Sequence, residues 1–311
     1  MKLKKYLPII GIAIFAYLLY KINLSSVLAE ISNANFFYLG VASAFIILSW
    51  FTSTYKWYVI ARRQKTKIPF LEAFKINLMS GFYGFVTPSR IGALIRVEYL
   101  KKFNEDKLGK GISNYVLEKI FDIGSLLLLV GISSFFFKEI ISANYLNYAL
   151  VGFAIFLIFI IILRDENNTK WLLRFFYAKF VPAKIKNGMR DGFYSFYEDM
   201  PERRLFIIFF LCNIINWVVL YSIFYFIGLS VGINVSFFYF LLFMPIVTLV
   251  GQIPITINGL GTREAVMISL FGLLGIEAAK IFSMSLINLL INGIVPAVIG
   301  ALLSFKEKNN S

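Results

Sequence analysis

The sequence predicts an all-α polytopic membrane protein with about six full transmembrane helices and two re-entrant hairpins of broken helix. Hydrophobic residues make up 59% of the chain and charged residues 15%, against roughly 45–50% and 25% in soluble proteins. Apolar runs of the roughly 20 residues that a membrane-spanning helix needs recur along the chain. Basic residues gather between these runs, and the positive-inside rule places such loops in the cytoplasm.

Six runs are predicted to be full transmembrane helices. They cover roughly residues 4–20, 36–60, 111–137, 147–163, 205–228 and 280–304. Residues 1–20 begin with Lys2, Lys4 and Lys5 and continue apolar from Tyr6 to Tyr20, which is also the pattern of a signal peptide, here with a cleavage site near Ala29. Because the apolar stretch is long for a signal peptide, we predict a retained signal-anchor helix instead.

Two further apolar stretches, 68–100 and 236–276, are interrupted by glycine, proline and arginine, so neither is predicted to be one continuous helix. Basic loops flank the first stretch at 62–67 and 101–110, and both are expected in the cytoplasm. A single crossing would place one of them outside, so we predict a hairpin that enters and leaves on the cytoplasmic face. With both termini inside, the second stretch becomes a hairpin from the outer face.

The two hairpins give the chain an internal symmetry within one integral membrane domain, residues 1–311. Residues 36–137 form the first half and 205–304 the second, and 138–204 joins them with a transmembrane helix and a basic amphipathic segment. The halves have opposite predicted topology, as in transporters built from inverted repeats around broken helices. The alternative is that glycine and proline are simply common in membrane helices. An arginine beside each break favours the repeat.

The first hairpin has a helix break that suits a phosphate group. Its central run is Thr87-Pro88-Ser89-Arg90-Ile91-Gly92, and Arg96 follows. Thr87 or Ser89 can cap a helix and Pro88 suits a first turn, so a half-helix is predicted to begin here. A helix N-terminus attracts anions through its free backbone N–H groups. The guanidinium groups of Arg90 and Arg96 add bidentate donors.

The second hairpin repeats this chemistry. It contains Pro254-Ile255-Thr256-Ile257-Asn258-Gly259-Leu260-Gly261-Thr262-Arg263-Glu264. Gly259 and Gly261 let the backbone approach a ligand closely, and Asn258 or Thr262 is predicted to cap the following half-helix. Arg263 again supplies the positive charge, so a second anion-binding tip is predicted.

A third cluster, Glu118, Lys119 and Asp122, lies in the predicted helix 111–137. Glu118 and Asp122 are four residues apart and share a helix face. Ionisable groups at membrane depth cost roughly 2.5–3.5 kcal/mol each on insertion scales, so they are expected to face the protein interior. Two interpretations stay open: a structural ion pair with Arg90, Arg96 or Arg263, or a role toward a substrate or a proton.

Several function classes have no residues to support them. The chain has no histidine and one cysteine, Cys212, so zinc, haem and iron–sulfur sites and histidine-dependent catalytic triads are not expected. We expect no cofactor and no metal. The net charge of +14 sits in loops between apolar runs, which favours anionic lipid headgroups over nucleic acid as its partner.

The sequence resembles the flippase-like membrane proteins related to the transmembrane region of lysylphosphatidylglycerol synthase. The resemblance covers most of the chain and rests on Thr87 through Gly92 with Arg96, on Glu118-Lys119 with Asp122, and on Pro254 through Glu264. It implies a polytopic protein that moves a charged lipid between leaflets. Lys119 departs from a pattern that more often has arginine. Only a short tail follows the last predicted helix, so lysyl or sugar transfer by a soluble domain is not expected.

The predicted function is translocation of an anionic or phosphate-containing lipid in the plasma membrane, with both termini cytoplasmic and without a nucleotide-binding motif. The predicted partners are a membrane lipid and a lipid-modifying or glycosyltransferase enzyme. Two alternatives stay open: a membrane-embedded lipid-linked transferase and a secondary transporter of a small anion. The predicted substrate-binding residues are Arg90, Arg96, Glu118, Asp122, Arg263 and Glu264, and the predicted break positions are Thr87, Pro88, Gly92, Pro254, Gly259 and Gly261.

Overall fold

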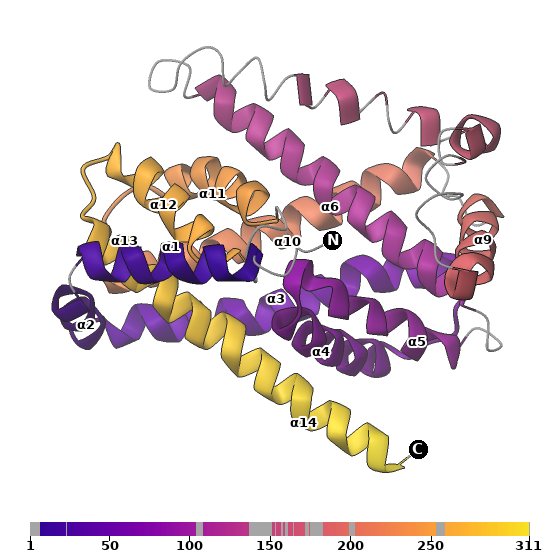
Figure 1. Ribbon diagram of the computed structural model, residues 1–311, viewed down its shortest axis with the longest axis horizontal. Coiled ribbons are helices and arrows are strands. Elements are labelled where there is room, and N and C mark those ends of the chain that lie inside the picture. Colours follow the sequence, from indigo (N-terminus) through magenta and orange to yellow (C-terminus); the bar gives the residue numbers. More distant parts are fainter. Residues whose placement is uncertain are drawn as a thin grey trace. The chain divides into compact units, whose positions relative to one another are not determined.

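The described part of the chain is helical throughout and contains no strand (Figure 1). The computed structural model describes residues 7–22, 24–103, 108–136, 183–198, 203–252 and 259–310, together with parts of 151–174. The first half of the chain contributes α1 (Leu7–Ile22), α2 (Leu24–Ser32), α3 (Phe36–Arg63), α4 (Phe70–Val86), the 3-10 segment η2 (Pro88–Leu94), α5 (Ile95–Lys101) and α6 (Gly109–Phe136). The second half contributes α9 (Ala183–Glu198), α10 (Arg203–Ser230), α11 (Phe237–Gly251), α12 (Thr262–Gly272), α13 (Ala278–Asn288), the π segment η4 (Leu289–Ile294) and α14 (Val295–Asn310).

Three of the described helical stretches are long and apolar enough to cross a membrane: Phe36–Arg63, Leu205–Ser230 and Ala278–Glu307. They coincide with three of the six predicted runs. The bent pair of α1 and α2, with 79° between its helices, makes a fourth if it is one span. The run predicted at 111–137 forms α6, which carries charged residues, and the run at 147–163 is described only in part.

The chain divides into two compact units. Unit 1 comprises Met1–Ser53, Phe74–Ile95 and Ile215–Ser311, and unit 2 comprises Thr54–Ala73 and Arg96–Ile214. The boundary falls within α3, α4, α5 and α10, so each of these helices contributes residues to both units.

The N-terminal helices pack against α13 in unit 1. Val27 of α2 is fully buried, and its carbonyl oxygen accepts a hydrogen bond of 3.2 Å from Ser283 of α13. The rings of Phe15 in α1 and Phe282 lie 5.2 Å apart. These contacts join α1 and α2 to α13.

The first interrupted stretch folds back on itself within unit 1. After α4 ends at Val86, the hydroxyl of Thr87 donates to the carbonyl of Tyr83 and accepts from the amide of Gly92, both at 2.7 Å. A β-carbon added to Gly92 would lie 2.1 Å from the Tyr83 carbonyl oxygen, which is closer than side chains approach. Only glycine therefore lets η2 return so closely against the end of α4.

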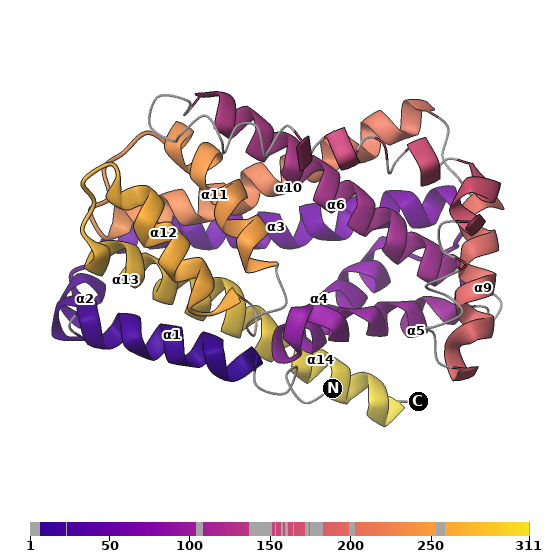
Figure 2. The same cartoon turned by 45° about the horizontal axis from the view of Figure 1, so that its top comes forward.

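The second interrupted stretch also folds back. Helices α11 and α12 run side by side (Figures 1 and 2), and a β-carbon on Gly259 would lie 3.1 Å from the α-carbon of Gly251. Gly259 and Gly261 both have positive φ, 76° and 84°, which glycine adopts without steric cost. Residues 253–258, with Pro254 and Asn258, lie outside the described residues.

Unit 2 has its own apolar core beneath the charged residues of α6. Its buried members are Ile60, Leu117, Phe121, Phe196 and Phe209. Phe196 comes from α9, the helix in the segment predicted to be basic and amphipathic. One face of α9 packs on α6, where Gly192 meets the side chain of Ile112, whereas Arg190 and Tyr194 are exposed.

Candidate functional site

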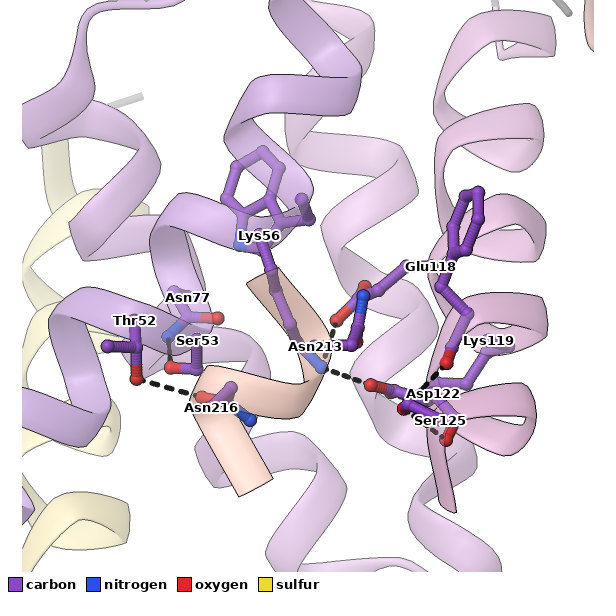
Figure 3. A network of polar contacts seen from close by, with 12 residues as sticks. Thr52, Ser53, Lys56, Asn77, Glu118, Lys119, Asp122, Ser125, Asn213 and Asn216 are labelled. Carbon is purple, nitrogen blue, oxygen red and sulfur yellow. Dashed lines mark hydrogen bonds and ion pairs between the residues drawn. The ribbon is translucent and has the colours of Figure 1, made fainter. Parts of the chain in front are cut away.

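Five charged side chains of unit 2 form one connected network, here named the charge network: Lys56, Arg96, Glu118, Lys119 and Asp122. Figure 3 shows Lys56 reaching from α3 toward two carboxylates of α6. Its ammonium lies 3.1 Å from Glu118 Oε1 and 2.5 Å from Asp122 Oδ1. Glu118 and Asp122 stand one helical turn apart, so a single lysine bridges both.

The other two cations stand at opposite ends of the network. Arg96 of α5 donates a hydrogen bond through Nη2 to Glu118 Oε2. Lys119 contacts the second oxygen of Asp122 at 3.3 Å. The contacts therefore form a chain in which cations and carboxylates alternate: Arg96, Glu118, Lys56, Asp122 and Lys119.

Four of these side chains are buried, and the fifth is not. The exposed fractions of the Lys56, Arg96, Glu118 and Asp122 side chains are all below 10%, whereas Lys119 is 47% exposed. A buried charge without a partner is strongly unfavourable, and a paired, hydrogen-bonded one is tolerated. The network thus satisfies its interior charges and leaves one cation accessible.

Aromatic rings hold the Arg96 guanidinium in place. Its central carbon lies 4.8 Å from the ring centre of Trp57 and 5.3 Å from that of Tyr115. Trp57 is itself fully buried, and its carbonyl accepts a hydrogen bond from the Asn114 amide at 3.1 Å. This packing fixes the orientation of the side chain, since cation–π contacts favour a guanidinium over a ring face.

Some buried polar atoms in unit 2 have no hydrogen-bond partner among the described residues. They are Arg96 Nε, Asn213 Oδ1, Gln64 Oε1 and Asn114 Oδ1. More than nine in ten buried polar atoms in proteins are satisfied by protein or water. The interior around the network therefore has unused donor and acceptor capacity.

Polar side chains also line α3 one turn before Lys56. In unit 1, Thr52 donates to Asn216 Oδ1 and Asn77 donates to the hydroxyl of Ser53, both at 2.9 Å (Figure 3). Such groups are rare in lipid-facing positions and mark helix surfaces turned to other helices or to water.

A second polar cluster lies in unit 1 at the start of α12. Glu264 is 1% exposed and accepts hydrogen bonds from the Gly261 amide at 2.6 Å, the Ser285 hydroxyl at 2.6 Å and Arg263 Nη2 at 3.0 Å. Arg263 also donates to Ser285 at 3.1 Å. The arginine is 15% exposed, so it is partly accessible and held in one orientation.

The N-cap position predicted at Thr87 is confirmed for η2, whereas the one predicted at Thr262 is wrong for α12. Thr87 occupies the N-cap of η2 without a side-chain cap bond, because its hydroxyl instead ties Tyr83 to Gly92. Gly261 is the N-cap of α12, and the carboxylate of Glu264 reaches back to its amide. Thr262 is the first helical residue there and donates to the Gly259 carbonyl. Pro88 stands at the first position of η2, as predicted.

The predicted site residues fall into separate groups. Arg96, Glu118 and Asp122 come together in unit 2, and Arg263 and Glu264 pair in unit 1. Arg90 is exposed at the fold-back of unit 1, in a left-handed backbone conformation with φ of 55°. The structure therefore contains one of the structural pairs left open from the sequence, Arg96 with Glu118.

Lys56 was missed by the sequence analysis, although it is central to the network. The available signal was a lysine seven residues before the end of a 28-residue helix whose apolar run otherwise lacks charge. Among the described residues, no three His, Cys, Asp or Glu side chains gather as a metal site.

Long apolar helices and a largely buried network of paired charges define an integral membrane protein with a polar interior. The sequence pattern of the lysylphosphatidylglycerol synthase TM region matches residues 8–300. The chain therefore belongs to this family.

Relatives support the same assignment. A UPF0104 membrane protein of Pyrococcus horikoshii is 22% identical, covering 98% of both chains. A UPF0104 membrane protein of Methanocaldococcus jannaschii is 24% identical over 93% of this chain and 89% of its own. A phosphatidylglycerol lysyltransferase of Staphylococcus aureus is 24% identical over 93% of this chain, but only 32% of its own length is matched.

Proposed function

We propose that this protein translocates a phosphate-containing lipid between the two leaflets of the plasma membrane. The observation that carries the proposal is the charge network. Each ionisable group within a membrane costs roughly 2.5–3.5 kcal/mol on insertion scales, and intramembrane charges usually mark substrate or ion pathways. A network of five such groups on three helices is more than packing of the bundle requires.

A lipid is the substrate that fits the family best. One relative is named as a phosphatidylglycerol lysyltransferase, and the region that it shares with this chain is a minor part of its length. We propose that this chain handles the lipid and that its partner is a lipid-modifying or glycosyltransferase enzyme.

The two fold-backs are the proposed re-entrant hairpins. In this proposal about six spans and the two hairpins form an inverted repeat, both termini are cytoplasmic, and the headgroup passes at the helix breaks. Support comes from the close return at Gly92 and the pairing of α11 with α12. Arg90 and Arg263 receive the phosphate, while Glu118, Asp122 and Glu264 hold the basic side chains in place.

The proposed topology makes a labelling prediction. In a Cys212→Ser background, single cysteines at Lys67 and Lys102 are expected to react with a membrane-impermeant maleimide from the same side of sealed vesicles. Both residues are exposed and flank the first fold-back. Labelling of the two positions from opposite sides would exclude a hairpin there.

The transport prediction uses the purified protein in liposomes with a fluorescent phosphatidylglycerol. Arg90→Gln and Arg263→Gln are each expected to slow the transfer between leaflets by about tenfold or more, because a hydrogen bond to a charged group is worth roughly 1.5–3 kcal/mol. Arg190→Gln is the matched control, since its side chain is exposed on α9 and 61% accessible. It is expected to match the wild type.

Equal rates for the wild type, both variants and empty liposomes would end the translocation proposal. The same liposomes separate the alternative functions. Formation of a new lipid by the protein with a divalent metal would favour a transferase, and uptake of a soluble anion without lipid movement would favour a secondary transporter.

A further inference from the structure

The charge network has more positive than negative charge. Its described members are three cations, Lys56, Arg96 and Lys119, and two carboxylates, Glu118 and Asp122. Four of the five are buried, so solvent screens their charges poorly. The described network therefore carries one positive charge more than its two carboxylates balance.

The geometry places this excess charge on Lys119. Glu118 is taken by Arg96 and by Lys56 at 3.1 Å. Asp122 holds Lys56 at 2.5 Å through one oxygen and contacts Lys119 more weakly, at 3.3 Å, through the other. Each carboxylate thus has a buried cation of its own, and Lys119 shares a partner that is already engaged.

Tyr115 joins Lys119 to the other end of the network. The Lys119 ammonium lies 5.4 Å from the centre of the Tyr115 ring, and the Arg96 guanidinium lies 5.3 Å from the same ring. Tyr115 and Lys119 are one helical turn apart on α6. Two cations therefore flank one aromatic ring, and Arg96 Nε there has no hydrogen-bond partner among the described residues.

We propose that Lys119 is the docking residue for a phosphate group with one negative charge, which neutralises the charge network. This inference adds a phosphate contact in unit 2 to those proposed at Arg90 and Arg263 in unit 1, and it rests on the proposed function for the identity of the lipid. The ligand class is a phosphodiester monoanion, as in a lipid such as phosphatidylglycerol. A zwitterionic lipid brings its own ammonium and leaves the excess charge in place.

Lys170 is a matched control for this site. Its side chain is 44% exposed, pairs with Glu166 at 2.6 Å and lies 5.1 Å from the ring centre of Tyr194. Exposure, carboxylate partner and aromatic neighbour thus resemble those of Lys119. The difference is that Lys170 has a carboxylate to itself, so its charge is balanced.

The test measures lipid binding to the full-length protein in a neutral detergent by native mass spectrometry. The probes are phosphatidylglycerol, phosphatidylcholine and inorganic phosphate. Wild type is expected to bind phosphatidylglycerol in preference to phosphatidylcholine, and Lys119→Gln to weaken that binding by about tenfold. Lys119→Arg is expected to stay within a few-fold of the wild type, and Lys170→Gln to leave binding unchanged.

The outcomes separate this inference from the proposed function. Wild-type affinity in Lys119→Gln, or an equal loss in Lys170→Gln, would overturn the docking role even if liposomes still show lipid transfer. Selective loss in Lys119→Gln without any transfer by the wild type would support the phosphate site and contradict translocation. Competition by inorganic phosphate as strong as that by the lipid would assign the same site to a soluble anion. A thermal melt of each variant confirms that it is folded.

Discussion

Replacing Glu118 with glutamine is expected to lower the free energy of unfolding by about 3–5 kcal/mol, the usual cost of removing one partner from a buried ion pair. Glutamine preserves the shape of the side chain but removes its charge. Lys56 then keeps only Asp122, and Arg96 loses its one carboxylate contact among the described residues. Thermal unfolding of the purified variant in detergent measures the effect.

Glu166→Gln is the control for this prediction. The Glu166 carboxylate pairs with Lys170, as Glu118 pairs with its cations. The side chains of both Glu166 and Lys170 are well exposed, however. Surface ion pairs contribute little because water and salt screen them, so this variant is expected to melt like the wild type. Equal melting of Glu118→Gln and wild type would mean that the network is not a buried, interdependent set of charges.

The long apolar helices could be predicted from the sequence, because each corresponds to one uninterrupted run of apolar residues. Three predicted runs match the three spans that meet the length and composition criteria, and the predicted break near Pro88 lies between α4 and α5. Glycine and proline cause such breaks locally, so sequence alone locates them. The number of runs that cross the bilayer cannot be read from local sequence, because it depends on whether charged helices such as α6 span the membrane.

The charge network was predictable only in part. The spacing of Glu118 and Asp122 placed both carboxylates on one face of a helix, and burial of these residues follows from their cost in lipid. Their partner Lys56 lies 66 positions away from Asp122 in the sequence. Such a pairing depends on how α3 packs against α6, which composition and periodicity do not specify.

Thr87 occupies the predicted N-cap position, but its hydrogen bonds differ from those of an ordinary cap for a different physical reason. A threonine before a proline usually accepts hydrogen bonds from the first turn of a helix. At Thr87 the fold-back brings the Gly92 amide and the Tyr83 carbonyl to the same hydroxyl, and the hydroxyl satisfies both. The close approach of η2 to the end of α4 thus overrides the capping preference of Thr87. This approach is possible because residue 92 is a glycine and has no side chain.

Gly92→Ala is expected to cost about 3 kcal/mol or more in stability, at or above the upper end of ordinary overpacking. The added β-carbon would lie 2.1 Å from the Tyr83 carbonyl oxygen and 2.7 Å from the Thr87 hydroxyl. Backbone atoms cannot rotate away as a side chain can, so either the turn opens or α4 shifts. Both responses break the hydrogen bonds of Thr87.

Gly81→Ala is the matched control on α4, where an added β-carbon meets nothing within 4 Å. Alanine is favoured over glycine inside a helix by roughly 0.5–1 kcal/mol, so this variant is expected to melt slightly higher than the wild type. The two glycine-to-alanine changes should therefore have opposite signs. If Gly92→Ala were as stable as Gly81→Ala, the fold-back could not be as tight as Thr87 and Gly92 require, and Arg90 would not be held at a turn.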